Sequence, residues 1–248
     1  MDKVALSPQE LSRYDRQMMI DGFGLEGQQK LKKAKVFIAG AGGLGSPISI
    51  YLAVAGVGHI RIIDRDVVDL SNLNRQILHW NQDVGRAKAE SAGAKLRGLN
   101  PDIKVEAIRE EITAANVDQL IEGFDVVVDA MDNFPTRYLL NATAVNKRLP
   151  FFHGGIYGMS GNATTIIPGK TPCLRCIFPE PPPSEKFPVI GVAPAVIGCI
   201  QATEVIKYIV GIGNLLTNRL LMFDGANMEF TEVRIKRKPA CKDCCSCV

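Results

Sequence analysis

The sequence predicts an α/β fold with a mixed sheet, on three observations. Short apolar runs alternate with helix-compatible segments over residues 36–147, which is typical of a parallel sheet covered on both faces. A glycine-rich turn at residues 40–45 follows the first apolar run directly. Toward the C-terminus, strand-like segments lie closer together, which favours antiparallel strands. We therefore expect a Rossmann-like mixed sheet, with a parallel N-terminal half continued by antiparallel strands.

The N-terminal element is predicted to be a helix. Residues 7–10, Ser-Pro-Gln-Glu, supply an N-cap, a proline at the first helical position and a glutamate three residues after the cap. Leu11, Tyr14 and Met18 would share one face of this helix. The alternation then predicts strands at 36–39, 60–64, 104–108 and 125–129, and helices at 46–54, about 85–98, near 113–121 and at 133–147.

The C-terminal part is predicted to continue the sheet with strands at 163–167, 219–223 and 229–235. The most apolar long segment, 189–212, carries Gln201, Glu204 and Lys207 at near-helical spacing. A bilayer-spanning helix would bear these polar groups only at a cost, so we expect a buried helix and no membrane partner. The proline-rich stretch 179–188 predicts a mobile crossover loop.

Composition and charge exclude several classes of protein. The 248 residues are 46% hydrophobic and 22% charged, which is ordinary for a globular protein. The net charge of +3 comes from 29 basic and 26 acidic residues without a block of like charge, which argues against nucleic acid as the main partner. The first ten residues include charged ones and lack an apolar signal core, so we expect a cytoplasmic protein with reduced thiols.

The glycine-rich turn predicts a nucleotide site. An apolar strand, a glycine turn and a helix start present backbone N–H groups and the positive end of a helix to phosphate. Glycine allows close approach of a ligand and the dihedral angles of a tight turn. Dehydrogenases use the same turn, so residues further along the chain must decide between hydride and nucleotidyl chemistry. The residues in question are Gly40, Gly42, Gly43, Leu44 and Gly45.

Charged residues after the turn favour nucleotidyl chemistry. Asp64 ends the second strand, 24 residues after Gly40, where a carboxylate accepts hydrogen bonds from ribose hydroxyls. A solvated aspartate at a strand end is the alternative. The polar loop 66–76 could face a triphosphate, and Arg75 and Lys88 could neutralise phosphate charge, although each could also be an ordinary surface charge. A dehydrogenase that binds a diphosphate has less need of two such cations.

Asp132 is a candidate ligand for Mg²⁺. It follows the strand at 125–129, so it emerges at the carboxyl end of the sheet, where open α/β sheets bind ligands. Magnesium prefers carboxylate and phosphate oxygens. The alternative is that Asp132 caps the following helix.

The cysteines form two close pairs, Cys173-x-x-Cys176 and Cys241-x-x-Cys244. Two such pairs can fill the four positions of a tetrahedral Zn²⁺ site and leave none open for substrate. We therefore predict a structural zinc site that ties the C-terminus and the proline-rich loop to the sheet. A redox pair is the alternative, and the long separation between the two pairs argues against it.

Taken together, the motifs resemble the MoeB/ThiF/HesA family of ubiquitin-activating-enzyme-like adenylyltransferases, closest to its molybdopterin-synthase branch. The resemblance covers almost the whole chain. It implies a single domain over 1–248, with a nucleotide-binding part at 1–170 and the crossover loop, helix, C-terminal strands and zinc site at 171–248. It is carried in order by residues 13–17, the glycine turn, Asp64, residues 71–76, Lys88, Asp132, Asn133, Arg137, both cysteine pairs, Gln201 and Glu204.

The resemblance implies that the C-terminal glycine carboxylate of a ubiquitin-like sulfur carrier attacks Mg²⁺-ATP, which gives an acyl-adenylate and pyrophosphate. Arg75 and Lys88 would neutralise the phosphates, and Asp132 would hold Mg²⁺. Asp64 would fix the ribose, and Asn72 would contact phosphate or metal. The nucleotide site would be completed by Asp66, Gln76 and Asn133.

The resemblance also implies a homodimer with composite active sites. In this family the arginine that matches Arg16 reaches the triphosphate bound by the partner subunit. Arg16 would therefore join Arg75, Lys88 and Asp132 as a catalytic residue.

The chain departs from those family members that form a covalent link with the carrier. They have a cysteine in the crossover loop, where this sequence has Ser184, and no cysteine lies between Cys176 and Cys199. A serine hydroxyl is a poor nucleophile without a dedicated base. We therefore predict adenylation without a covalent cysteine intermediate, and a separate persulfide sulfur donor.

The remaining cysteines support weaker hypotheses. Cys245 and Cys247 could carry persulfide sulfur, and the alternatives are an extra zinc ligand at Cys245 or a disordered end. Cys199, within the apolar segment, is interpreted as a core residue.

Three other functions are alternatives to this one. A related enzyme could adenylate a small carboxylate or a tRNA-linked one. A non-catalytic nucleotide-binding partner would predict loss of Arg16, Arg75, Lys88 or Asp132, and all four are present. A dehydrogenase would explain neither the cysteine pairs nor the cations around the glycine turn.

Overall fold

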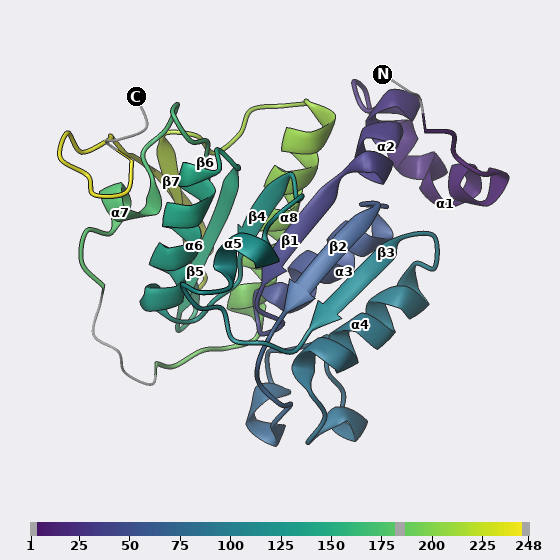
Figure 1. The fold of residues 1–248 in the computed structure, drawn as a ribbon, viewed down its shortest axis with the longest axis horizontal. Coiled ribbons are helices and arrows are strands. Elements are labelled where there is room, and N and C mark those ends of the chain that lie inside the picture. The colour runs from purple at the N-terminus through teal and green to yellow at the C-terminus, as the bar shows by residue number, and fades with distance from the viewer. Residues whose placement is uncertain (1–3, 182–186, 245–248) are drawn as a thin grey trace.

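The computed structural model describes residues 4–181 and 187–244, and its strands form one eight-stranded sheet in the order β3-β2-β1-β4-β5-β6-β7-β8 (Figure 1). The first five strands in this order are mutually parallel, and the last three continue the sheet antiparallel, as predicted. The strands are β1 (Lys35–Ala39), β2 (His59–Ile63), β3 (Lys104–Ile108), β4 (Val126–Asp129), β5 (Phe151–Tyr157), β6 (Ser160–Ile166), β7 (Arg219–Asp224) and β8 (Glu229–Arg234).

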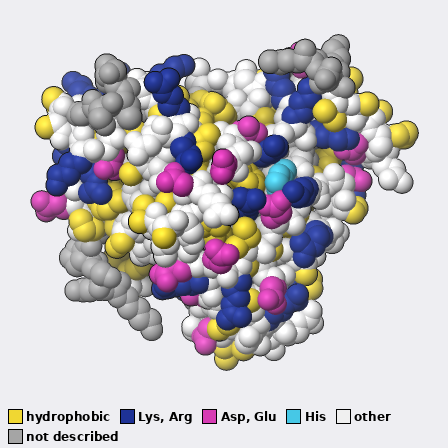
Figure 2. All heavy atoms as spheres, viewed as in Figure 1, with side chains coloured by type: hydrophobic (Ala, Val, Ile, Leu, Met, Phe, Trp, Pro, Cys, Tyr) yellow, Lys and Arg dark blue, Asp and Glu magenta, His cyan; other side chains and the backbone are white. Residues whose placement is uncertain are grey.

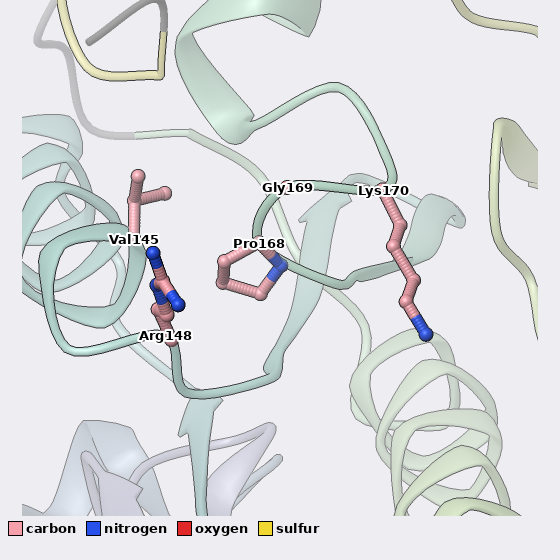
Figure 3. A pocket seen from close by; sticks show the side chains of 5 residues that line it. All are labelled: Val145, Arg148, Pro168, Gly169 and Lys170. Carbon is pink, nitrogen blue, oxygen red and sulfur yellow. The ribbon is translucent and has the colours of Figure 1, made fainter. Parts of the chain in front are cut away.

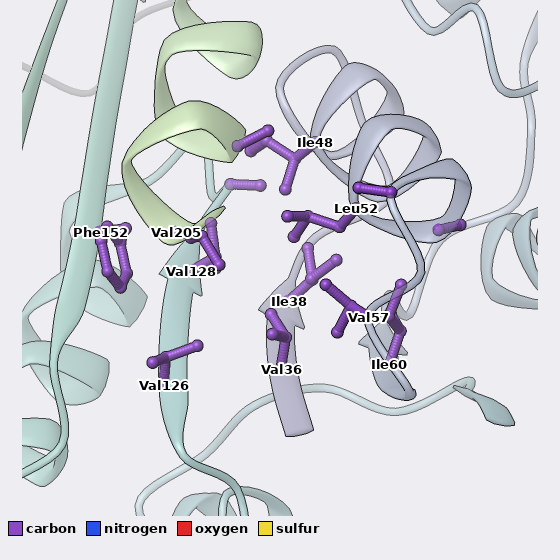
Figure 4. Close-up of a cluster of buried hydrophobic side chains, with 14 of the residues drawn as sticks. Val36, Ile38, Ile48, Leu52, Val57, Ile60, Val126, Val128, Phe152 and Val205 are labelled. Atoms are coloured by element: carbon purple, nitrogen blue, oxygen red, sulfur yellow. The ribbon is translucent and has the colours of Figure 1, made fainter. Parts of the chain in front are cut away.

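Helices cover both faces of the sheet, so two apolar clusters form. One cluster packs α3 (Gly45–Val54), α4 (Lys88–Leu99) and α8 (Val192–Val210) against the strands. In Figure 4, Ile48 and Leu52 of α3 lie over Ile38 of β1. The other cluster lies under α5 (Val117–Leu120), α6 (Phe134–Asn146) and α7 (Leu174–Ile177). Short 3₁₀ turns occur at Leu70–Asn72 and Asn81–Asp83.

The N-terminal helices α1 (Pro8–Met18) and α2 (Gly24–Lys33) pack at the amino ends of the strands. The predicted capping box is present, because the Glu10 N–H donates to Ser7 Oγ at 3.2 Å and the Ser7 N–H donates to Glu10 Oε2 at 2.7 Å. Tyr14 is buried and its hydroxyl accepts from Asn100 Nδ2 at 2.8 Å, just before β3. Leu11 and Tyr14 are three residues apart on α1 and so share the predicted face, although Leu11 is 40% exposed.

Several element boundaries differ from the predictions. Helix α2 and strand β5 were not predicted, and β6 begins three residues earlier than expected. The helix expected from residue 85 begins at Lys88, because the preceding backbone pairs with Val68: Gly85 N–H donates to the Val68 carbonyl and Val68 N–H donates to the Arg86 carbonyl, both at 2.8 Å. The segment near 113–121 forms only the short helix α5.

Helix α8 is long and apolar enough, by composition alone, to cross a membrane. Gln201 and Glu204 instead form hydrogen bonds inside the protein. Gln201 Nε2 donates to the backbone carbonyls of Asp129 and Phe152, and the Glu204 carboxylate accepts from Thr165 Oγ1. The helix is therefore a core helix, as its spacing of polar residues predicts.

The proline-rich crossover is described only at its ends. The Gly158 N–H donates to the Pro188 carbonyl at 2.8 Å, so the loop reaches the β5–β6 turn at the carboxyl end of β5. Ser184 lies outside the described residues.

On the surface, basic and acidic side chains are interspersed over the face shown in Figure 2, in keeping with the small net charge.

Candidate active site at the carboxyl ends of β1 and β4

The candidate site lies where the strand order changes direction. β1 pairs with β2 on one side and with β4 on the other, and the chain leaves the two central strands toward opposite edges of the sheet. Gly40 follows β1 and Ala130 follows β4, and the Ala130 N–H donates to the Ala39 carbonyl at 2.9 Å. Open α/β sheets bind ligands at such a point, outside the carboxyl ends of the strands.

The glycines of the turn differ in whether their surroundings leave room for a Cβ atom. Gly40 has a φ of +104°, and a Cβ there would lie 2.6 Å from the Ala130 carbonyl oxygen. A Cβ on Gly45 would lie 2.0 Å from the Gly40 carbonyl oxygen. A Cβ on Gly42 would meet nothing nearer than Gln76 Nε2 at 3.6 Å. Packing within the protein does not require glycine at position 42. The space beside Gly42, at the start of α3, is therefore free for a ligand.

Asp64 is built into the turn. Its Oδ2 accepts from the Ala41 N–H and its Oδ1 from the Asp66 N–H, both at 2.9 Å. Burial raises the pKa of the Asp64 carboxyl, against the opposing effects of the Ala41 N–H and the Lys88 charge. The alternative of a solvated strand-end aspartate is therefore wrong.

His79 supports the same turn and was not singled out from the sequence. It is 3% exposed, with Nε2 2.9 Å from the Ala41 carbonyl and Nδ1 2.9 Å from Ser91 Oγ. Burial lowers its pKa, so the ring is neutral, and Nε2 carries the proton because a carbonyl only accepts. No motif or spacing marks this residue in the sequence.

The predicted cations flank the turn. Lys88 begins α4, is 6% exposed, and lies with Nζ 3.2 Å from Asp66 Oδ2. Arg75 lies beside Gly43, 3.7 Å from where a Cβ would be, and its guanidinium donates to the Ser71 carbonyl at 3.0 Å. Both cations are thus held next to the glycine turn.

The side-chain amides of Gln76 and Asn72, both predicted site residues, differ in their hydrogen bonding. Gln76 is 4% exposed, and its Oε1 has no hydrogen-bond partner among the described residues. A buried acceptor of this kind is costly unless a ligand satisfies it. The Asn72 side chain is already engaged, because its Oδ1 accepts from the Asp69 N–H at 3.1 Å.

Asp132 is exposed at the carboxyl end of β4. The helix that follows is capped by Asn133, whose Oδ1 accepts from the Thr136 N–H at 2.9 Å. The alternative role of Asp132 as the N-cap is therefore wrong. The backbone carbonyl before it, that of Met131, accepts from Arg137 Nε at 3.1 Å.

Within one chain, Arg16 does not lie near the other residues of the candidate site. It is exposed on α1, and α1 contacts the segments that precede β2 and β3: Gln17 Nε2 donates to the Ala55 carbonyl, and Tyr14 binds Asn100. These contacts place α1 at the opposite end of the sheet from the glycine turn. A role for Arg16 in the site therefore needs a second copy of the chain.

The four predicted cysteines come together as one buried cluster. Cys173 Sγ lies 3.5 Å from Cys241 Sγ and 3.9 Å from Cys176 Sγ, and Cys176 Sγ lies 3.5 Å from Cys244 Sγ. Four thiolates at about 2.3 Å from a tetrahedral Zn²⁺ would be about 3.8 Å apart, so the cluster fits zinc. Cys245 and Cys247 lie outside the described residues.

Neighbouring polar groups join this cluster to α6. Asp243 accepts from Arg175 Nε at 3.0 Å and from Asn141 Nδ2 at 2.8 Å.

Cys199, in contrast, lies on α8 away from the four clustered cysteines, is only half-buried, and has a pKa raised by burial. Its interpretation as a core residue holds only in part.

A hollow of about 290 Å³ lies at the other end of the sheet, beyond the start of β5 (Figure 3). Lys170 points away from Arg148 in this view, so the two cations do not converge on one ligand. The hollow is separate from the candidate site and is lined by Val145, Arg148, Pro168, Gly169 and Lys170.

Fold and site define a Rossmann-like α/β protein with a four-cysteine cluster that fits a zinc site. The family model described as "ThiF family" matches residues 14–245. The chain therefore belongs to the ThiF family and is an enzyme of the adenylyltransferase class.

The chain is also similar to named proteins along nearly its whole length. It is 46% identical to the "SAMP-activating enzyme E1" of Haloferax volcanii, over 97% of this chain and 91% of the relative. It is 42% identical to the "Sulfur carrier protein adenylyltransferase" of Thermus thermophilus, over 95% and 91%. With the "Adenylyltransferase and sulfurtransferase MOCS3" of Culex quinquefasciatus it shares 44% identity over 98% of this chain and 56% of that protein.

Among solved structures, E. coli MccB with ATP resembles the chain with a TM-score of 0.83 at 27% identity, over 94% of this chain and 74% of that one. E. coli MccB with MccA-N7isoASN gives a TM-score of 0.84 at 25% identity, over 98% and 76%.

Proposed function

We propose that this protein adenylates the C-terminal glycine carboxylate of a small ubiquitin-like sulfur carrier, using ATP and Mg²⁺. The observation that supports this most is the convergence of the glycine turn, Arg75, Lys88 and Asp132 at the carboxyl ends of β1 and β4. The names of the relatives from Haloferax and Thermus favour a protein carrier as the acceptor.

The reaction poses a problem of charge, because an anionic carboxylate must reach an anionic α-phosphate. The carboxylate oxygen forms a bond to the α-phosphorus, the bond from that phosphorus to the bridging oxygen breaks, and pyrophosphate leaves with the electron pair. No proton moves, since the carboxylate is already ionised at neutral pH. Catalysis therefore consists of positioning and electrostatic stabilisation.

Each residue of the site has a role in this proposal. Arg75 and Lys88 neutralise the phosphates from either side of the glycine turn. The turn binds phosphate through its N–H groups, and Asp64 accepts from the ribose. The exposed carboxylate of Asp132 holds Mg²⁺, which supplies further positive charge to the phosphates when bound. Asp66, Asn72, Gln76 and Asn133 complete the nucleotide site.

Three finer features belong to the proposal. Adenylation proceeds without a covalent cysteine, since no cysteine lies between Cys176 and Cys199, and a separate persulfide donor supplies sulfur. Residues 1–248 act as one catalytic unit in the cytoplasm. Two such units form a homodimer in which Arg16 reaches the partner's nucleotide, because α1 holds it far from its own.

Carrier-dependent exchange of labelled pyrophosphate into ATP tests the proposal. Candidate carriers that end in Gly-Gly are compared with versions that lack the final glycine. Arg75→Ala should slow exchange about a hundredfold, the loss typical of removing one charge-stabilising group. Arg97→Ala is the matched control, because Arg97 is exposed near the end of α4 and donates to the Val105 carbonyl, away from the site. ATP binding without exchange for any carrier would overturn the carrier as substrate and favour a small or tRNA-linked carboxylate.

A further inference from the structure

A buried ionic group lies directly behind Asp132. Asp129, the last residue of β4, is 0% exposed, and His153 stands opposite it on β5 with 1% exposure. His153 Nδ1 lies 2.7 Å from Asp129 Oδ2. A buried carboxylate is costly unless it is paired and hydrogen-bonded, and an apolar pair would fill this space at less cost.

The same group fixes the peptide that leads into Asp132. Asp129 Oδ1 accepts from the Met131 N–H at 3.1 Å. The Met131 carbonyl accepts from Arg137, through both Nε and Nη2. Arg137 is itself 6% exposed, and its Nε lies 3.7 Å from Asp129 Oδ2. Both backbone groups of the residue before Asp132 are therefore held by buried charged side chains.

The hydrogen bonds define the state of His153. Burial lowers its pKa, so the ring is neutral. The Asp129 carboxylate only accepts, so Nδ1 carries the proton and Nε2 is an acceptor. His153 Nε2 has no hydrogen-bond partner among the described residues, and neither has Asn162 Oδ1 on β6. The hydrogen bond to Asp129 of β4 is therefore the one that fixes the ring within this part of the chain.

We propose that Asp129, His153 and Arg137 form a buried clamp that holds the Met131–Asp132 peptide and so positions the Asp132 carboxylate for a divalent cation. The three are positioning residues, since they lie behind the site and would touch neither substrate nor cation. The inference rests on the proposed function, in which Asp132 holds Mg²⁺.

Metal binding and backbone exchange test the clamp in the full-length protein. Mn²⁺, titrated by electron paramagnetic resonance in the presence of ATP, reports the affinity without catalysis. His153→Leu removes the donor to Asp129 and should weaken Mn²⁺ binding about tenfold, as loss of a supporting partner does in other metal sites. It should also speed hydrogen exchange at the Met131 amide. His153→Asn keeps an N–H near the position of Nδ1 and should restore most of the affinity.

Thr164→Val is the matched control, because it also removes a buried polar group. Thr164 lies opposite His153 on β6, is 2% exposed, and donates to the Leu216 and Arg219 carbonyls rather than to the clamp. This variant should lower the melting temperature and leave Mn²⁺ affinity unchanged. Equal loss of affinity in Thr164→Val and His153→Leu would show a general structural effect and overturn the clamp.

Asp132→Asn separates the two proposals. If it leaves Mn²⁺ affinity unchanged, Asp132 is no ligand and the proposed role of this residue fails, and the clamp fails with it. If it weakens binding while His153→Leu does not, only the clamp is wrong. Should His153→Leu fail to fold, Arg137→Lys is judged by the same criteria, because lysine keeps the charge but cannot offer two N–H groups to the Met131 carbonyl.

Discussion

Gly42 and Gly45 occupy one turn but face different constraints. A Cβ at 45 would lie 2.0 Å from the Gly40 backbone oxygen, whereas a Cβ at 42 would have 3.6 Å to the Gln76 side chain. The first contact is impossible without a backbone shift, and the second is ordinary packing. Only at 42 is the space free for a ligand, so stability and binding can be separated by mutation.

We expect Gly45→Ala to lower the free energy of unfolding by about 3 kcal/mol or more, because the backbone must move. Gly42→Ala should change stability by less than about 1 kcal/mol, yet weaken ATP binding at least tenfold by blocking the approach of phosphate. Urea denaturation and calorimetric ATP titration measure the two effects. A Gly42→Ala protein that binds ATP normally would show that phosphate does not lie at this turn.

The site residues that could be predicted are those with a fixed place in a motif. Gly40, Asp64 and Asp132 follow strands, and their offsets from the strand ends fix where they emerge. His79 and His153 could not be found in this way, because they act through contacts between segments far apart in the sequence. The place of Asp129 at a strand end could be predicted, but its burial could not. A lone buried histidine has no spacing that distinguishes it from a core residue.

At the level of elements, β2 and β3 are joined by a charged cluster around Glu106. Arg61 Nη2 lies 2.6 Å from Glu106 Oε2 and His59 Nε2 lies 3.2 Å from Oε1, with Lys104 also bound. Burial by itself would raise the pKa of Glu106, but the hydrogen bonds from Lys104 and Arg61 outweigh it and hold the pKa at about 2. The ionised carboxylate therefore stabilises the folded state.

Because this pKa lies below the ordinary value of 4.5, the stabilisation is complete above pH 4.5 and is lost as the pH falls through 2. Glu106→Gln should lower the free energy of unfolding at pH 7 by about 1 to 2 kcal/mol, after allowance for solvent screening. The difference from wild type should shrink as the pH falls below 4.5. Urea denaturation over a pH series tests this, with Glu26→Gln as the exposed control. A difference that stays constant with pH would contradict the account.

The cysteine cluster holds the segment after β8 against α6 and α7. We expect one zinc per chain by elemental analysis. Cys176→Ser should remove the zinc and lower the free energy of unfolding by about 3 kcal/mol or more, since metal binding contributes to folding. Cys199→Ser is the control, because Cys199 lies outside the cluster, and it should keep the zinc. Full stability of Cys176→Ser would contradict a structural role.

Elements with strong local signals were predictable, and those that depend on tertiary packing were not. The capping box of α1 and the strand-to-turn pattern of β1 depend only on residues that are close together in the sequence. Strand β5 contains His153, Gly154 and Gly155 and shows no alternation, because it is buried between β4 and β6. Helix α2 has a buried side of only Gly27, Gln28 and Leu31, too small an apolar stripe to mark it.

At the scale of the whole molecule, the proposed role of Arg16 requires a second copy of the chain. Arg16 lies on α1 at the amino ends of the strands, whereas the glycine turn lies at their carboxyl ends. In the proposed homodimer each site combines Arg16 of one chain with Asp132 of the other. Arg16→Ala and Asp132→Ala should each be inactive alone.

Subunit exchange between these two variants tests the composite site. Random exchange makes half of the dimers mixed, and each mixed dimer has one intact site of two, so about a quarter of wild-type exchange activity should return. The mixture should elute as a dimer in size-exclusion chromatography. If no activity returns although mixed dimers form, Arg16 and Asp132 do not meet across the interface.

Transfer of label from α-labelled ATP to the carrier tests the central claim most directly. The account predicts that AMP becomes attached to the carrier's C-terminal carboxylate, with release of unlabelled pyrophosphate, and that a carrier lacking its final glycine stays unlabelled. Label that remains in ATP, or that appears on another molecule while the carrier stays unmodified, would contradict it.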